Sequence, residues 1–138
     1  MYPVFVRIVL LMVCIVPVGC GGPVHHVCKV RGEVFVEGQP AGGAVVHFHP
    51  VSKEGNAPAF ATVEDDGTFE LSTFGNYDGA EPGDYAVTIC WRDEERIDGQ
   101  LVTYGDRLGD RYSTPGVSKL NATIVDGEND LPRFELNK

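Results

Sequence analysis

Apolar and polar side chains alternate with a period of two residues in short segments along the chain after residue 29. Successive side chains of a β-strand point to opposite faces, so this pattern indicates strands with one buried face. In the clearest segment, 84–91, one face carries only large apolar side chains, namely Tyr85, Val87, Ile89 and Trp91. The alternation predicts seven strands, at residues 30–37, 44–49, 59–63, 68–72, 84–91, 120–125 and 131–136.

The residues between these segments favour turns over helices. The chain has 17 glycines and 9 prolines, which interrupt helices and are common in turns. Asp66-Gly67 predicts a hairpin turn between two strands, and Asp126-Gly127 predicts a second turn. Because 138 residues suit a single hydrophobic core, we expect one all-β domain. The expected fold is an antiparallel sandwich of about seven strands, immunoglobulin-like or prealbumin-like.

The segment from Arg92 to Tyr112 shows neither period clearly. It mixes six acidic with four basic side chains, so we expect a long exposed loop, with at most one helical turn. Loops of this length without secondary structure are uncommon and often functional. The sequence therefore predicts that this segment is mobile and forms the contact surface for a partner.

The first 19 residues have the features of an export signal. Residues 8–18 are an unbroken apolar run of 11 residues after Arg7. A membrane-spanning helix needs about 20 such residues, whereas a signal peptide needs fewer. The motif PVGCGG resembles a bacterial lipoprotein signal, which implies cleavage before Cys20 and lipid attached to that cysteine. Pro17 departs from the usual leucine, and a plain secretory signal or an uncleaved anchor are the alternatives.

These features predict how the chain is organised and where it resides. Residues 1–19 would be the signal peptide, 20–27 the lipidated cysteine with a short tether, and 28–138 the β-sandwich. We expect an exported protein that is lipid-anchored to the membrane and faces the periplasm or the cell exterior. Two further cysteines, Cys28 and Cys90, would then lie in an oxidising compartment. They form either a disulfide or two free buried thiols.

The chain resembles a known family over residues 29–137. The resemblance rests on three segments: VRGEVFVEGQPAGGAVVHFHP, VEDDGTFELSTFGNYDGAEPGDYAVTI and DRYSTPGVSKLNATIVDGENDLPRFEL. They resemble small planctomycete-type lipoproteins with a carboxypeptidase regulatory-like, transthyretin-like sandwich. The resemblance implies a fold and a location but no activity. Related sandwiches serve as structural, adhesive or sugar-binding modules, and fold alone does not give function.

Charge and motifs narrow the function classes. The net charge of −9 disfavours nucleic acid as a partner, because phosphates require a basic surface. No Gly-x-Ser-x-Gly motif is present, and all four histidines precede residue 50 without a serine or cysteine partner nearby. We therefore expect no enzymatic activity and no cofactor.

Two histidines are the candidate metal ligands. His47 and His49 share one face of a predicted strand, although the sequence supplies no third ligand at a recognisable spacing. The alternative is that both are polar residues on a solvated face, and His25-His26 in the tether would bind metal only loosely.

The expected function is a non-enzymatic structural or interaction module whose partner is an unidentified envelope protein or glycan. The alternative is a module that binds a metal ion or a carbohydrate, and an enzyme is third. A sugar binder needs exposed aromatic side chains in a concavity, for example Trp91, Tyr77 or Tyr104.

Overall fold

The computed structural model describes residues 21–22, 24–52 and 55–138, so the predicted signal peptide and Cys20 lie outside the described residues. The described part contains strands, turns and bends but no helix. It therefore contains no helix that is long and apolar enough to cross a membrane. In chain order the strands are β1 (Val30–Val36), β2 (Gln39–Pro40), β3 (Val45–Pro50), β4 (Ala59–Thr62), β5 (Thr68–Glu70), β6 (Gly83–Cys90), β7 (Arg92–Ile97), β8 (Gln100–Asp106), β9 (Leu120–Ile124), β10 (Asn129–Asp130) and β11 (Phe134–Leu136).

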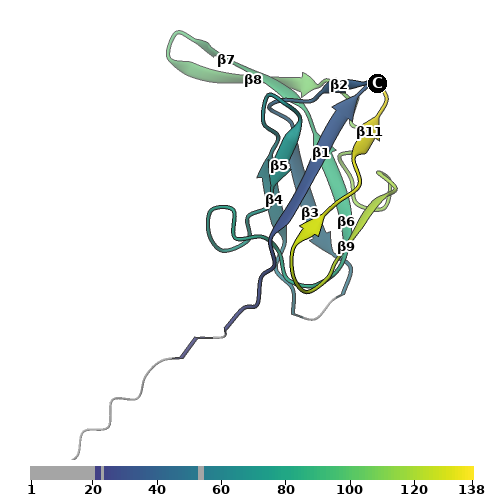
Figure 1. The fold of residues 1–138 in the computed structure, drawn as a ribbon. Helices are drawn as coiled ribbons and strands as arrows, with labels where there is room; N and C mark the ends of the chain where they lie inside the picture. Colours follow the sequence, from purple (N-terminus) through teal and green to yellow (C-terminus); the bar gives the residue numbers. More distant parts are fainter. Residues whose placement is uncertain (1–20, 23, 53–54) are drawn as a thin grey trace, which may run out of the picture.

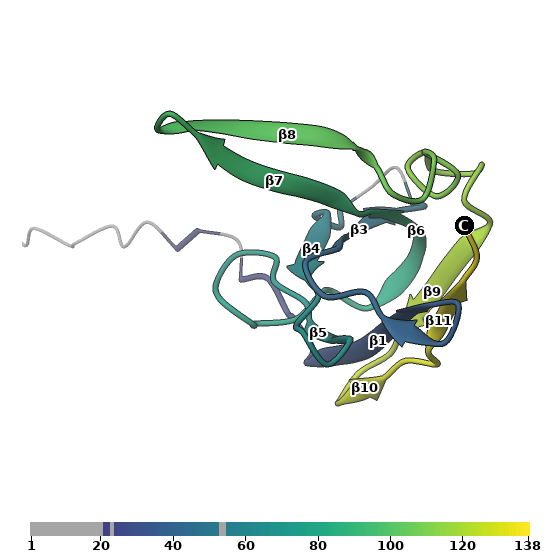
Figure 2. The same cartoon turned by 90° about the horizontal axis from the view of Figure 1, so that it is seen from above.

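Two sheets face each other, and a two-stranded hairpin projects from one end (Figures 1 and 2). The first sheet is built around β1, which pairs antiparallel with β2 and β5 and parallel with β10 and β11. The second sheet has the order β4-β3-β6-β9, and all its pairs are antiparallel. The predicted all-β sandwich is confirmed, and each of the seven predicted segments contains a strand. The first sheet is mixed, in contrast to the purely antiparallel arrangement expected.

The core forms where the apolar faces of the two sheets meet. Val34 of β1, Val46 and Phe48 of β3, and Tyr85 and Val87 of β6 are fully buried. The Phe48 ring lies 6.3 Å from the Phe69 ring and 5.9 Å from the Tyr85 ring, centroid to centroid. Burying one such side chain stabilises the fold by about 1.5 to 3 kcal/mol. The period-two alternation in the sequence therefore corresponds to the inner face of the sandwich.

The turn at Asp66-Gly67 forms as predicted. The Glu64 N–H donates to the Thr68 carbonyl at 2.7 Å, and the Thr68 N–H donates to the Asp66 carboxylate at 3.0 Å. The two arms then separate, because β4 joins the second sheet and β5 joins the first. One more antiparallel pair, Phe60 with Ser72, links the arms below the turn. The β4–β5 edge thus closes one side of the sandwich.

Residues 92–112 correct the expectation of an unstructured loop. β7 and β8 form a hairpin, and Asp98 and Gly99 at its tip have φ angles of 51° and 82°. Positive φ at both central residues is the geometry of a type I′ turn, for which Asp-Gly is a preferred pair. Both strands are almost entirely exposed, because the hairpin extends away from the sandwich (Figure 2). Beyond it, Leu108 is fully buried in the core.

Candidate functional site

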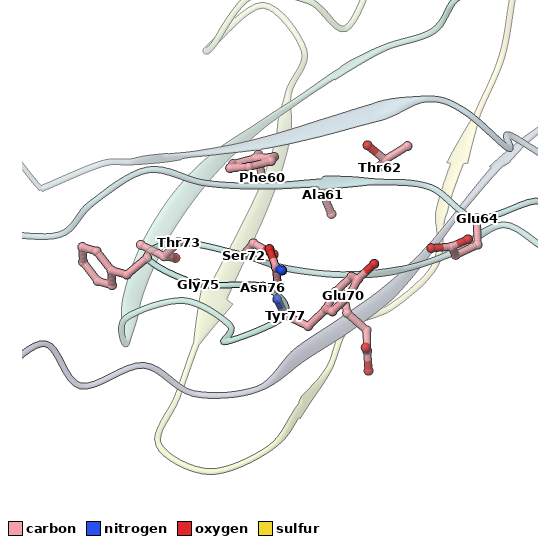
Figure 3. Close-up of a pocket in the computed structure, with 11 residues that line it drawn as sticks. Phe60, Ala61, Thr62, Glu64, Glu70, Ser72, Thr73, Gly75, Asn76 and Tyr77 are labelled. Carbon is pink, nitrogen blue, oxygen red and sulfur yellow. The ribbon is translucent and has the colours of Figure 1, made fainter.

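A groove lies along the β4–β5 edge and has a volume of about 410 Å³. Three aromatic side chains in its lining, Phe60, Phe74 and Tyr77, are each 51% to 52% exposed. Polar side chains complete the lining, namely Thr62, Glu64, Glu70, Ser72, Thr73 and Asn76. Figure 3 shows Phe60 on one side of the groove and Tyr77 with Glu70 on the other. The groove therefore combines apolar ring surfaces with hydrogen-bonding groups.

The alternation of β4 places Phe60 on the outside. Its neighbours Ala59 and Ala61 point into the core and are buried, so the ring of Phe60 faces solvent. The Phe60 ring lies 6.4 Å from that of His47 on the adjacent strand. Large apolar side chains gathered on an exposed surface are more informative than a single one, because such patches often mark binding sites.

The loop that carries Phe74 and Tyr77 is fixed by Asp78. Its carboxylate accepts hydrogen bonds from the backbone N–H groups of Thr73 at 2.8 Å, Phe74 at 3.0 Å and Gly75 at 2.8 Å. Burial raises the pKa of Asp78, but these N–H groups together lower the pKa further, so the net pKa lies below the usual carboxyl value. The ionised carboxylate thus holds the loop in one conformation.

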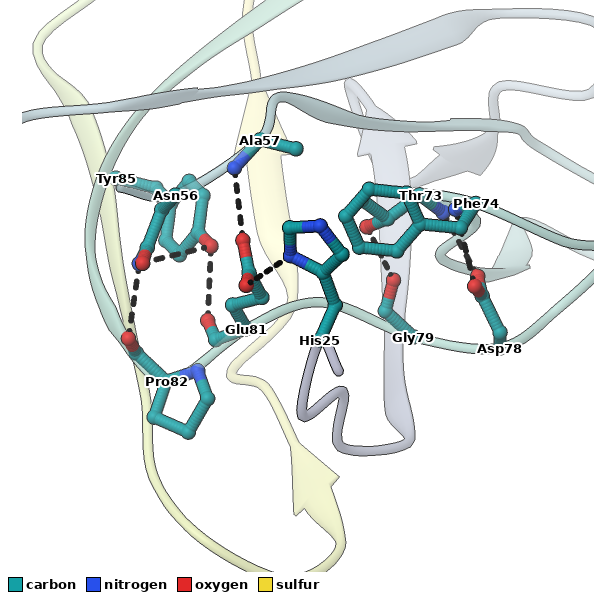
Figure 4. Close-up of polar contacts among 10 residues, drawn as sticks. All are labelled: His25, Asn56, Ala57, Thr73, Phe74, Asp78, Gly79, Glu81, Pro82 and Tyr85. Carbon is teal, nitrogen blue, oxygen red and sulfur yellow. Dashed lines mark hydrogen bonds and ion pairs between the residues drawn. The ribbon is translucent and has the colours of Figure 1, made fainter. Parts of the chain in front are cut away.

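A second group of contacts fixes Phe74 of the same loop (Figure 4). The His25 ring packs on the Phe74 ring with centroids 4.3 Å apart, and its Nδ1 lies 3.1 Å from Oε1 of Glu81. The other oxygen of Glu81 accepts the N–H of Ala57 at 2.8 Å, while the Tyr85 hydroxyl donates to the Glu81 carbonyl at 2.8 Å. Burial raises the pKa of Glu81, and the hydrogen bonds from Ala57 and His25 lower it to a net value below the usual one.

His47 and His49 lie side by side on the outer face of β3, as predicted. Their ring centroids are 6.1 Å apart, and Nε2 of His49 lies 2.9 Å from the Thr88 hydroxyl. Burial and the nearby charge of His49 lower the pKa of His47. The potential metal ligands that cluster within the described residues lie elsewhere, at His26, Cys28 and Asp126. The structure supplies no third ligand next to His47 and His49 in that part of the chain.

Cys28 and Cys90 are free thiols, so the disulfide alternative is not formed. Cys28 pairs with Ala80, three residues before β6, whereas Cys90 is the last residue of that strand. A strand rises about 3.3 Å per residue, which separates the two cysteines by the length of β6. Cysteines in a disulfide have Cα atoms within about 7 Å, so this pair cannot be bridged in this fold.

Of the three aromatic residues considered for sugar binding, Tyr77 alone lines the groove. Trp91 is buried, with its Nε1–H donating to the Gly42 carbonyl at 3.0 Å and the Arg107 guanidinium over its ring. Tyr104 lies on the projecting hairpin, where its hydroxyl donates to Glu95 at 2.9 Å. Sequence reasoning missed Phe60, although an aromatic residue at an outward position of a strand was a usable signal.

Neither a protein-family model nor a curated protein sequence matches this chain. Among solved structures, a candidate carbohydrate-binding protein from Pseudomonas aeruginosa aligns with a TM-score of 0.45 and 14% identity, over 81% of this chain and 88% of its own. A 9R-lipoxygenase from Cyanothece aligns with a TM-score of 0.45 and 11% identity, over 84% of this chain and 17% of the lipoxygenase. A DUF3823 family protein from Parabacteroides merdae aligns with a TM-score of 0.40 and 19% identity, over 81% of this chain and 46% of that protein.

Proposed function

We propose that this protein is a non-enzymatic binding module of the cell envelope and that the groove along β4 and β5 takes a carbohydrate. The observation that carries the proposal is the set of three half-exposed rings, Phe60, Phe74 and Tyr77, in one groove with polar side chains between them. Pockets that orient a ligand combine apolar surface with a few placed polar groups. The apolar faces of a sugar ring stack on aromatic rings, and its hydroxyls form hydrogen bonds with polar side chains.

The charge of the groove narrows the class of carbohydrate. Glu64 and Glu70 lie in the lining, and the chain as a whole carries a net charge of −9. Glu70 is paired with Arg31 at 3.0 Å, which leaves Glu64 as the acidic group of the lining that has no ion pair with any of the described residues. Acidic polysaccharides would be repelled by this surface. A neutral or amino sugar therefore suits the groove best.

We expect Phe60→Ala and Tyr77→Ala each to weaken glycan binding about tenfold, which corresponds to about 1.4 kcal/mol. Both rings are half exposed, so their removal leaves the core intact. The measurement is binding of the full-length protein to a panel of immobilised neutral, amino and acidic oligosaccharides, followed by titration of the best one.

The matched control is Tyr104→Ala, because Tyr104 is 45% exposed but lies on β8, outside the groove. It should bind glycans as the wild type does. If no oligosaccharide binds, or if the control loses as much affinity as the groove variants, the groove is not a carbohydrate site.

The envelope location rests on the sequence of the first 20 residues. An apolar run of 11 residues followed by Gly19 and Cys20 supports export and lipid attachment at Cys20. We expect Cys20→Ala to leave the protein unprocessed or to shift it from the membrane to the soluble fraction, because the run is too short to span a bilayer. Fractionation after a high-salt wash measures this, and an equally membrane-bound variant would contradict the lipid anchor.

A further inference from the structure

Three potential metal ligands from distant parts of the sequence meet beside the start of β1. Nε2 of His26 lies 3.6 Å from Sγ of Cys28 and 2.7 Å from Oδ1 of Asp126, and that sulfur lies 3.8 Å from the same oxygen. Asp126 is 100 residues from His26 in the sequence. Cys28 is buried, whereas His26 and Asp126 are exposed. The cluster therefore has one inner ligand and a side that is open to solvent.

The three distances suit a tetrahedral ion. With Zn–S of about 2.3 Å and Zn–N of about 2.1 Å, tetrahedral angles place the sulfur and nitrogen about 3.6 Å apart. The two distances from the sulfur, 3.6 Å and 3.8 Å, are close to this value. The nitrogen and oxygen would move apart from 2.7 Å to about 3.3 Å, a small change for two exposed side chains.

The arrangement differs from a catalytic Cys–His–Asp relay. In such a relay the thiol and the carboxylate contact opposite nitrogens of the imidazole, which passes a proton between them. Here Cys28 and Asp126 both approach Nε2 of His26. Convergence of three ligand atoms on one point is what a metal ion requires, and a thiol with an imidazole suits zinc rather than calcium or magnesium.

The backbone around two of the ligands is held rigidly. Cys28 exchanges hydrogen bonds with Ala80, N–H to carbonyl at 2.8 Å and 3.0 Å. The turn that carries Asp126 is fixed by the buried Asn129, whose side chain donates to the Val125 carbonyl at 2.8 Å and accepts the Val125 N–H at 2.9 Å. The Asn129 N–H also donates to the carbonyl of Lys29, next to Cys28, at 2.9 Å.

The third ligand comes from the segment that precedes β1. His26 and Cys28 are two residues apart, and the 3.6 Å between Nε2 and Sγ shows that both side chains lie on the same side of the chain. His26 thus joins the cluster from the predicted tether, while Cys28 and Asp126 belong to the sandwich.

We propose that His26, Cys28 and Asp126 bind one Zn²⁺ ion, with water in the fourth position. Binding deprotonates the Cys28 thiol, and its proton goes to solvent as the Zn–S bond forms. The ion fastens the segment before β1 to the turn between β9 and β10. It also fixes the position of His25, the neighbour of His26, which packs on Phe74 at the groove.

The test uses full-length protein that has been freed of metal with a chelator and kept reduced. Co²⁺ added alone should produce a thiolate-to-cobalt charge-transfer band, and one equivalent of Zn²⁺ should abolish it. His26→Ala and Asp126→Asn change exposed side chains and should each weaken Zn²⁺ binding at least about tenfold. Even the loss of a residue that only hydrogen-bonds to a metal ligand lowers metal affinity by about 10- to 100-fold. Zn²⁺ should raise the Tm of the wild type but not that of His26→Ala.

Two matched controls separate this site from other ligands in the chain. His25→Ala removes the neighbouring histidine, and Cys90→Ser removes the other cysteine in the described residues; both should bind Zn²⁺ as the wild type does. Absence of the cobalt band in the wild type would overturn the site. A band that persists in Cys28→Ser, or full Zn²⁺ affinity in either His26→Ala or Asp126→Asn, would overturn it equally.

Discussion

Gly79→Ala should destabilise the fold by about 3 to 5 kcal/mol, among the largest effects of any single substitution in this chain. Gly79 has a φ of 106°, a conformation that other residues adopt only with strain. A Cβ atom there would lie 2.5 Å from the carbonyl carbon of Cys28 and closer still to its oxygen. The backbone must then move, which breaks the paired hydrogen bonds between Cys28 and Ala80. Strain of about 1 to 3 kcal/mol adds to about 1 kcal/mol for each lost bond.

The matched control is Gly55→Ala. Gly55 has a nearly identical φ of 101°, but no atom of the described residues lies within 4 Å of a Cβ built there. Its substitution should cost only the conformational strain, about 1 to 3 kcal/mol. Urea unfolding of both variants measures the difference, and equal destabilisation would show that contact with Cys28 contributes nothing.

The sandwich was predictable because apolar and polar residues alternate along its strands. In β1, β3 and β6 the alternating residues of the sequence are the ones that are buried, and no tertiary information was needed to find them. The parallel pairing of β1 with β10 and β11 was not predictable in this way. Alternation identifies which face of a strand is buried, but not which neighbour it pairs with.

The β7–β8 hairpin shows where alternation fails as a guide. Its strands lie outside the core, so neither face needs to be apolar, and cross-strand pairs such as Glu95 with Val102 hold it together. The local signal was the Asp98-Gly99 pair, which specifies a two-residue turn without reference to burial. Exposed apolar side chains on the hairpin, Ile97 and Leu101, leave its predicted role as a contact surface open to test.

The candidate sites depended on tertiary structure even more strongly. The groove combines Phe60 of β4 with Phe74 and Tyr77 of a loop, and the antiparallel pair of Phe60 with Ser72 holds them next to each other. The metal cluster joins His26 to a turn 100 residues away. His26 and Cys28 had the spacing of two ligands on one side of an extended segment, but the third ligand is brought by the β9–β10 turn.

Asp78→Asn should loosen the loop that carries Phe74 and Tyr77. The substitution removes the charge and one of the two oxygens that accept the three backbone N–H groups of Thr73, Phe74 and Gly75. Hydrogen bonds to charged groups contribute about 1.5 to 3 kcal/mol each, so we expect a loss of about 2 to 4 kcal/mol. Glycan binding should fall as it does when a groove ring is removed, although every ring is still present.

The dependence on pH gives a second readout of the same carboxylate. Because the folded-state pKa of Asp78 lies below the usual value, the unfolded chain binds more protons than the folded protein near pH 4. The stability that Asp78 contributes is therefore complete above about pH 5 and is lost as the pH falls through the folded-state pKa. The difference in free energy of unfolding between wild type and Asp78→Asn should therefore shrink as the pH falls. Glu81 also has a lowered pKa, but it is present in both proteins, so its contribution cancels in this difference.

The control for this prediction is Asp66→Asn. Asp66 also accepts hydrogen bonds from the backbone and hydroxyl of one residue, Thr68, but Asp66 itself is not part of the groove lining. This variant should keep wild-type glycan affinity and the pH dependence that Asp78 causes. If Asp78→Asn binds the glycan as tightly as Asp66→Asn does, the loop does not need its carboxylate to present the rings, and the groove must be shaped by the strands alone.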